Sequence, residues 1–331
     1  MSTSQLNKNN HKNIEMYEIN TDNGQEWQTL HAKLALFDFH TPLPSKREHI
    51  CRLFYNNCNG ISINNTINAH LKQKRQKTKL QYIRDIEVST KLHGLIRQMK
   101  AWEVDVTCLS EFNTAWEERV PRTVVREITK EHDKNGCWTV STSSISVRNF
   151  VKPGGTATLT MDDYTSKLAT RGTDPWKLGR WSYVVIEGKC ERLLTVTGYR
   201  VGKRSGKAGP TTAWSQQKTL LTKANRSEEP HMAFLKDLKT WLEPYIKSGH
   251  RMIISLDANE KWTDKADIKV FASTLQLHNI NEIYNLPDTH PNVLDTERST
   301  NIDYCLCCNN VLEHITYASL VPYNLETLGD H

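Results

Sequence analysis

The sequence predicts an α+β fold in which two β-sheets pack on each other and helices cover the outside. Three observations lead to this prediction. Short stretches rich in β-branched and aromatic residues, separated by Gly, Lys, Asp and Pro, fill 136–200 and indicate an antiparallel meander. Helical patterns flank this strand-rich middle, and apolar strand patterns recur at 49–57 and 301–307. We therefore expect one main domain.

The individual elements follow from the same periodicities. A strand is expected at 49–57, another at 104–111, a third at 251–259 and a last one from 301. Apolar residues at helical spacing predict the first helix, and they are Leu92, Leu95, Ile96 and Met99. The second helix is expected over 228–247, with Ser227 as its N-cap and Gly249 as its stop. A third is expected near 264–277.

The N-terminus does not follow these patterns. Residues 1–45 are polar and Asn-rich, which predicts a partly disordered extension in front of a domain at 46–331. The N-terminus has no apolar segment typical of a secretory signal, so we expect an intracellular protein. No apolar run approaches the roughly 20 residues that cross a bilayer, and no membrane association is expected. The eight cysteines are expected to be reduced and mostly buried.

Charge is unevenly distributed along the chain. Residues 255–331 hold 12 acidic and four basic residues, whereas residues 1–254 hold 39 basic and 25 acidic ones. A basic body with an acidic C-terminal part is typical of a polyanion-binding protein whose carboxylates hold a cation. An ordinary solvated surface is the alternative, and composition leaves it open.

Polar side chains end several of the predicted strands. Asp257 and Asn259 follow the apolar run 252–254, and residues i and i+2 of a strand face the same side. Asn57 and Asn59 form a second such pair. A carboxylate and an amide that project together suit a metal or phosphate site, but Asp and Asn are also common in plain turns. Glu111, Tyr199 and Arg200 lie where other strand patterns end, and Asp303 lies near the start of the last one. Asp330 and His331 end the chain.

Six of these stretches occur in the order typical of one known family. The stretches are YNNCNGI, VDVTCLSE, VTGYR, IISLDANE, STNIDY and LGDH. They resemble the successive motifs of the endonuclease/exonuclease/phosphatase superfamily, which includes deoxyribonuclease I, abasic-site endonucleases and the endonuclease domains of non-LTR retrotransposons. The resemblance covers roughly residues 48–331. It implies a four-layer α/β/β/α sandwich of two mixed sheets. DPWKLGRW, GYR and LDANE most resemble the retroelement-type members.

The sequence departs from the family pattern in three places. Ser255 and Leu256 replace the usual residues before Asp257, and Gly329 replaces the serine of the final motif. Family members continue beyond the residue equivalent to His331 into a closing strand. We therefore expect a domain that lacks its last strand and is truncated at its C-terminus.

The resemblance also implies roles for the residues at the strand ends. Metal ligands are expected at Glu111, Asn59 and Asp330, with Mg²⁺ as the cofactor and Mn²⁺ as the alternative ion. His331 is expected to be the general base, with its ring oriented by Asp303. Asp257 is expected to position a water molecule or assist the leaving group. The expected hydrogen-bond donors to the phosphate are Asn57, Asn259 and Tyr199.

Two basic stretches are candidates for contact with nucleic acid. Arg200, Lys203, Arg204 and Lys207 lie in a Gly-rich loop after a strand that ends in site residues. Lys and Arg there can neutralise phosphates, although a solvated loop is the alternative. The second stretch, 71–79, is the weaker candidate.

These inferences together predict a Mg²⁺-dependent phosphodiester hydrolase, specifically a DNA endonuclease of retroelement type. The alternatives are a phosphatase or a lipid or RNA phosphodiesterase of the same fold, and a non-catalytic nucleic-acid-binding remnant. DNA is the expected partner of a monomeric chain that belongs to a longer polyprotein with reverse transcriptase. A nuclear location is expected if the protein is a retroelement endonuclease.

Overall fold

The computed structural model describes residues 13–19, 45–61, 91–146, 150–203, 209, 211–286 and 302–322. These residues form two six-stranded sheets that pack face to face. The first sheet consists, in spatial order, of β12 (Ile315–Pro322), β1 (Asn13–Ile19), β2 (Cys51–Asn57), β3 (Val106–Ser110), β5 (Thr156–Thr160) and β4 (Cys137–Ser141). The second consists of β10 (Leu277–Asn279), β11 (Asp303–Cys308), β9 (Arg251–Asp257), β8 (Arg192–Tyr199), β7 (Trp181–Glu187) and β6 (Leu168–Thr173).

Both sheets are mixed, and they are built alike. Strands β2 and β3 pair in parallel near the middle of the first sheet, and β8 and β9 pair in parallel near the middle of the second. The other pairings are antiparallel. The carboxyl ends of the central strands therefore lie at one end of each sheet.

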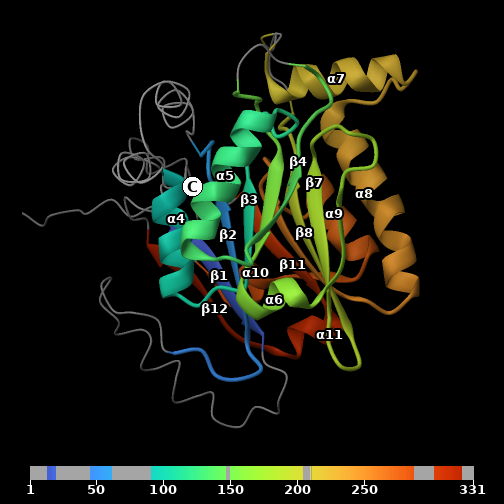
Figure 1. The fold of residues 1–331 in the computed structure, drawn as a ribbon. Helices are drawn as coiled ribbons and strands as arrows, with labels where there is room; N and C mark the ends of the chain where they lie inside the picture. Colours follow the sequence, from blue (N-terminus) through green and yellow to red (C-terminus); the bar gives the residue numbers. More distant parts are fainter. Residues whose placement is uncertain are drawn as a thin grey trace, which may run out of the picture.

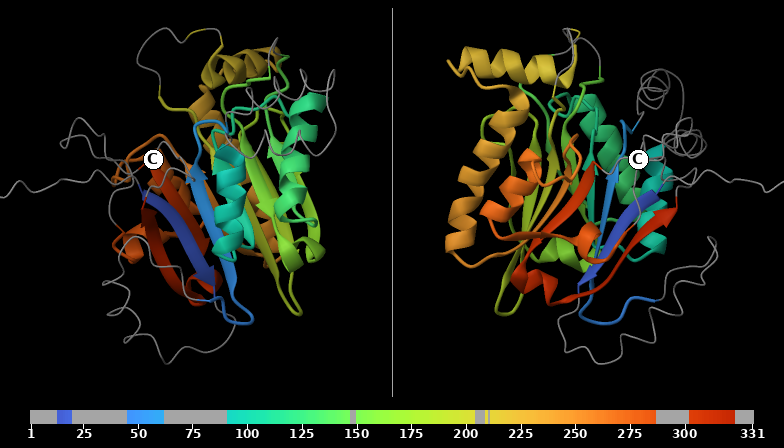
Figure 2. Two further views of the ribbon diagram at one scale, coloured as in Figure 1. Left: turned by 60° about the vertical axis from the view of Figure 1, so that its left-hand side comes forward. Right: turned by 180° about the vertical axis from the view of Figure 1, so that it is seen from behind.

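Helices cover the outer face of each sheet, which completes the four layers (Figure 1, Figure 2). Helices α4 (Lys91–Ala101) and α5 (Arg119–His132) pack on the first sheet, and α8 (Pro230–Lys247) and α9 (Asp267–Thr274) pack on the second. The remaining described helices are α6 (Asp162–Ser166), α7 (Ala213–Lys223), α10 (Ile280–Ile283) and α11 (Asn309–Leu312). The predicted sandwich of two mixed sheets with outer helices is confirmed.

Alternation along the strands explains this layering. In β2, Phe54 belongs to the core under α4 and α5, whereas Leu53 and Tyr55 face the second sheet. Ile253 of β9 meets them from the other side. Neighbouring strand residues point to opposite faces, so one strand supplies two cores. Each fully buried Leu, Ile or Phe side chain contributes about 1.5–3 kcal/mol.

Most predicted elements are found, with two corrections. The expected strands and helices correspond to β2, β3, β9 and β11, and to α4, α8 and α9. Helix α8 begins at Pro230, after Glu229 instead of Ser227, because proline is favoured in the first turn. The strand-rich stretch 136–200 is not one meander: β4 and β5 join the first sheet, and β6, β7 and β8 join the second.

The N-terminal extension also needs correction. Within the predicted extension 1–45, Asn13–Ile19 forms β1, which pairs with both β2 and β12. The apolar residues Ile14 and Met16 alternate with polar ones, as in a strand, but they stand in an Asn-rich context that favoured disorder. Among the described helices, none is long and apolar enough to cross a membrane.

Candidate active site

Two turns of the same kind end β2 and β9, one in each sheet. The backbone N–H of Asn59 donates to Asn57 Oδ1 at 3.0 Å, and that of Asn259 donates to Asp257 Oδ1 at 3.1 Å. Asn59 and Asn259 have left-handed φ values of 38° and 48°, which asparagine tolerates better than most residues. The Asp-x-Asn and Asn-x-Asn stretches are therefore turns, as one of the two interpretations held.

A hydrogen bond joins these two turns across the sheets. Asn57 Nδ2 donates to Asp257 Oδ2 at 2.8 Å, and both residues are 1% exposed. The carboxamide of Asn57 is thereby fixed at both ends. Asp257 uses one oxygen for its own turn and the other for the opposite sheet. The turn interpretation and the site interpretation are compatible, because they use different oxygen atoms.

A second contact across the sheets connects Tyr199 with Glu111. Tyr199 lies beside Asp257 in the register of β8 and β9, and its hydroxyl bonds the Glu111 side chain. Burial, followed by the charges of Glu111 and Asp257, raises the pKa of Tyr199 well above its usual value, so the hydroxyl stays protonated and donates. Glu111 has a φ of 49°, a strained conformation for glutamate that is typical of functional sites.

A third contact across the sheets involves Tyr55, which the sequence did not identify as a site residue. Its hydroxyl donates to Asp303 Oδ1 at 2.7 Å and lies 2.9 Å from Ser110 Oγ, which therefore donates to the tyrosine oxygen. Burial and the charges of Asp303 and Asp257 raise the pKa of Tyr55. Asp303 is itself opposite Asp257 in the register of β11 and β9. The sequence signal was the position of Tyr55 two residues before Asn57, on the same face of β2.

Residues around these contacts hold the loops in place. Lys91, at the start of α4, donates to the carbonyl oxygens of Cys58 and Gly60 in the loop after β2. Gly154 has a φ of 76°, and a Cβ there would lie 3.0 Å from the Tyr199 ring. The backbone of 154 can approach Tyr199 so closely only because glycine has no side chain.

Arg200 corrects a prediction, since it does not offer its charge to a ligand. Its guanidinium is buried and donates to Glu260 at 2.7 Å and to the carbonyl oxygens of His231 and Ala258 at 3.0 and 3.4 Å. It also forms an ion pair with Asp267. Asp and Glu partners are what a buried arginine requires. Arg200 thus fixes the turn after β9 and does not lie on a surface that DNA could reach.

The other predicted nucleic-acid contacts are only partly described. Lys203 has an exposed side chain that pairs with Glu260 at 3.0 Å and with Asp267 at 2.9 Å. Arg204 and Lys207 lie outside the described residues, as do the stretch 71–79, Asp330 and His331. The expectation that the domain lacks its closing strand also concerns this end of the chain, which lies outside the described residues.

The donor set suits a hard divalent cation. Glu111 and Asn59 are less buried than Asn57 and Asp257, and they follow neighbouring strands of the first sheet. Carboxylate and amide oxygens are the ligands that Mg²⁺ takes, usually with one or two carboxylates and several water molecules. The predicted ligands Glu111 and Asn59 fit this chemistry.

Solved structures similar to this chain share low sequence identity with it. No family model and no curated protein sequence matches the chain. An endonuclease/exonuclease/phosphatase family protein from Leptotrichia buccalis is 12% identical, with 77% of this chain and 86% of that one covered and a TM-score of 0.46. The AP endonuclease LMAP from Leishmania major is 15% identical, with 78% of each chain covered and a TM-score of 0.47. The endonuclease domain of TRAS1, a telomere-specific non-LTR retrotransposon, is 14% identical, with 71% and 92% covered and a TM-score of 0.39.

Proposed function

We propose that this chain is a metal-dependent phosphodiester hydrolase that acts on DNA. The observation that carries the proposal is the set of three hydrogen bonds across the sheets: Asn57 to Asp257, Tyr199 to Glu111, and Tyr55 to Asp303. They gather carboxylates and neutral donors from both sheets at the carboxyl ends of the central strands. A purely structural core would place apolar side chains there, because buried carboxylates are costly.

The chemistry of the residues fits hydrolysis of a phosphate ester. Asn57 and Tyr199 carry N–H and O–H donors that would turn from Asp257 and Glu111 to phosphate oxygens when a substrate binds. Asp257 would accept a proton from water or position it. Glu111 and Asn59 would hold a divalent cation, which supplies positive charge to the phosphate and makes bound water more acidic.

Asp303 has a supporting role in this proposal. Tyr55 holds one of its oxygens, so the carboxylate is oriented before any substrate binds. Asp303 would accept the ring N–H of His331, the predicted general base, and fix its tautomer. Asp330 is the further metal ligand that the motif resemblance implies.

The finer assignment to a retroelement endonuclease rests on the motif resemblance. The excess of basic residues in 1–254 supports a polyanionic substrate. In this proposal the chain is a monomeric unit of a polyprotein that contains reverse transcriptase, and it acts in the nucleus.

A plasmid-nicking assay tests the proposal. Supercoiled DNA should be nicked in Mg²⁺ or Mn²⁺ and left intact in EDTA. Glu111→Gln and Asp257→Asn should each lose most of the activity, since each removes one charge from the site. Asp264→Asn removes the same charge from a side chain that is 92% exposed, and it should nick at the wild-type rate. Equal rates for all four proteins would contradict the proposal.

Substrate class can be decided in the same experiment. Single-stranded RNA, a phosphoinositide and a simple phosphate monoester are offered alongside the plasmid. Hydrolysis of one of these with the plasmid left intact would retain the phosphoesterase and refute the DNA substrate. Binding of DNA without cleavage of any substrate would instead favour the non-catalytic alternative.

A further inference from the structure

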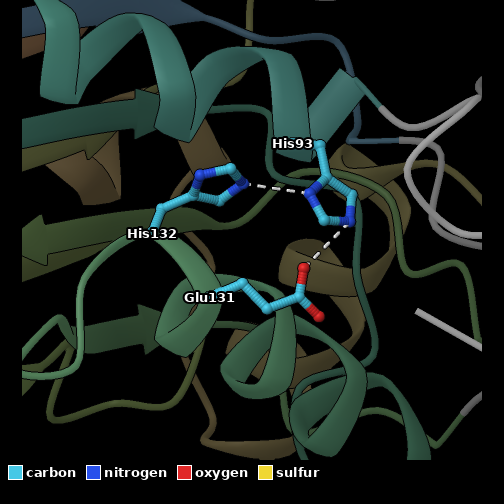
Figure 3. A group of neighbouring side chains, drawn as sticks. All are labelled: His93, Glu131 and His132. Carbon is cyan, nitrogen blue, oxygen red and sulfur yellow. Dashed lines mark hydrogen bonds and ion pairs between the residues drawn. The ribbon is translucent and has the colours of Figure 1, made fainter. Parts of the chain in front are cut away.

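Three metal-ligating side chains meet where α4 packs against α5, on the outer face of the first sheet (Figure 3). His93 comes from α4, and Glu131 and His132 come from the end of α5. His93 Nδ1 lies 3.1 Å from His132 Nε2, and His93 Nε2 lies 3.8 Å from Glu131 Oε2. One ligand atom from each residue fits within 4.8 Å of the other two. None of the three belongs to the candidate active site.

The buried imidazole of His93 is not satisfied by its protein neighbours. The residue is only 7% exposed, and its Nε2 atom has no hydrogen-bond partner. The 3.8 Å separation from Glu131 is too long for a hydrogen bond. If Nδ1 donates its proton to His132, Nε2 carries a lone pair that faces the Glu131 carboxylate. If Nδ1 accepts from His132, Nε2 carries a proton that has no hydrogen-bond acceptor. A cation bound between the Nε2 lone pair and the carboxylate would remove the first mismatch.

We propose that His93, Glu131 and His132 form a binding site for a transition-metal dication, with Zn²⁺ as the best match. Two imidazoles and one carboxylate are a common zinc ligand set, and imidazole also suits Co²⁺ and Ni²⁺. Metal–ligand bonds of roughly 2.0–2.2 Å place tetrahedral ligand atoms about 3.3–3.5 Å apart. The 3.1 and 3.8 Å separations start from different nitrogen atoms of His93, and only one of these can bind a given ion. One ligand atom from each residue already lies within 4.8 Å of the other two, so side-chain rotations would bring the three into that range.

The surroundings fit a metal that links two helices. The Glu131 side chain is 26% exposed, which leaves one side of the cluster open to a solvent ligand. Burial, together with the charges of His132 and Arg97, lowers the pKa of His93 to about 4, so the ring is neutral at physiological pH. A bound metal would tie the start of α4 to the end of α5. Since Lys91 of α4 also holds the loop after β2, the same helix would be fixed at two points.

Cobalt spectroscopy of the metal-free full chain tests this site. Co²⁺ should bind and give visible bands of nitrogen and oxygen coordination, without the near-ultraviolet bands of thiolate ligands. His132→Gln and Glu131→Gln should each weaken Co²⁺ and Zn²⁺ binding by about tenfold or more. Glu127→Gln removes an exposed carboxylate one turn earlier on α5, and it should bind as the wild type does.

Two further measurements keep this result separate from the proposed hydrolase and from folding defects. Glu111→Gln should retain the Co²⁺ spectrum, because Glu111 is not part of the cluster. Zn²⁺ should raise the melting temperature of the wild type and of Glu127→Gln by a few degrees, but not that of His132→Gln. A wild type without the Co²⁺ bands, or wild-type affinity for Co²⁺ in both His132→Gln and Glu131→Gln, would show that His93 and His132 are only a hydrogen-bonded pair.

Discussion

At the scale of single residues, Tyr55 connects the buried core with the candidate site. Its hydroxyl receives a hydrogen bond from Ser110 and gives one to Asp303. Tyr55→Phe keeps the ring but removes both bonds. We expect about 10–100-fold slower nicking through a lower kcat, as for other residues that orient a functional group. The free energy of unfolding should fall by about 1–3 kcal/mol.

Tyr284→Phe is the matched control for this change. Tyr284 donates its hydroxyl proton to the carbonyl oxygen of Ile315 at 3.0 Å. Ile315 is the first residue of β12 and lies level with the start of β2, whereas the candidate site lies at the end of β2. This variant should lose stability without a change in nicking rate. If both tyrosine variants cleave at the wild-type rate, Tyr55 has a structural role alone.

Site residues differed in how far the sequence could identify them. Asn57, Asp257 and Asn259 could be singled out as candidates because polar residues end apolar strands, but the spacing alone left a plain turn as the alternative. Tyr55 shares a face of β2 with Asn57, but tyrosine is an ordinary core residue in an apolar strand, so its hydrogen bonds were needed to indicate a role. Arg200 follows a predicted strand in a basic loop, and its burial depends on Glu260 and Asp267, which are distant in sequence.

At the scale of elements, the loop before β5 depends on glycine at 154. A Cβ there would meet Tyr199 at 3.0 Å and Ala213 at 2.9 Å, and the φ of 76° is unfavourable for alanine. Gly154→Ala should lower the free energy of unfolding by about 2–4 kcal/mol through backbone strain and overpacking. Gly249 has a similar φ of 72°, and a Cβ added there would have no other atom within 4 Å. Gly249→Ala should cost only about 1 kcal/mol. Urea unfolding measures both, and equal losses would mean that Tyr199 moves aside freely.

The Arg200 cluster joins the ends of β8 and β9 to α8 and α9. Arg200→Met removes the buried charge and leaves Glu260 and Asp267 without it, which should cost about 3–5 kcal/mol. Lys203→Ala removes an exposed cation from the same carboxylates and should cost no more than about 1 kcal/mol. Denaturant titration of both variants decides this, and an Arg200→Met protein as stable as the wild type would show that the cluster adds nothing to stability.

The same cluster predicts a dependence on pH. Burial raises the pKa of Glu260, but hydrogen bonds from Lys203 and Arg200 outweigh it and hold the pKa below the usual 4.5. A lowered folded-state pKa contributes stability above the unfolded value, and this stability is lost as the pH falls through the folded value. Stability should therefore decrease as the pH falls below about 4.5, and less steeply in Glu260→Gln. Identical slopes in the two proteins would contradict this assignment.

At the scale of the whole molecule, the layers could be predicted but the partition of strands could not. Alternation of residues such as Leu53 and Phe54 indicates two cores for one strand. By contrast, β5 (TATLT) and β7 (WSYVVIE) are both short strands rich in β-branched residues, and nothing local assigns them to different sheets. The choice of sheet depends on tertiary packing, which overrides local preference. Helix α5 was not predicted, although Val124, Val125 and Ile128 have the spacing of an amphipathic helix.

The two sheets are held together differently along their length. An apolar core that includes Leu53 and Ile253 fills much of the middle, where Thr158 also bonds Thr197 across the sheets. Hydrogen bonds to carboxylates join the strand ends at the candidate site. The bond between Asn57 and Asp257 should therefore contribute to sheet packing as well as to the site. A double-mutant cycle of Asn57→Ala and Asp257→Ala should give a coupling free energy of about 1–3 kcal/mol.

Asn57→Ala combined with Asp264→Ala is the control cycle, because Asp264 is 92% exposed and has no contact with the site. It should be additive within about 0.5 kcal/mol. Additivity in the first cycle as well would mean that the bond between Asn57 and Asp257 does not help to hold the sheets in register. The polar strand ends would then be retained for chemistry and not for stability. Coupling in the first cycle alone would mean that this hydrogen bond contributes to both sheet packing and the candidate site. The effect of a substitution at Asn57 on nicking can then be interpreted only if the free energy of unfolding is measured on the same protein.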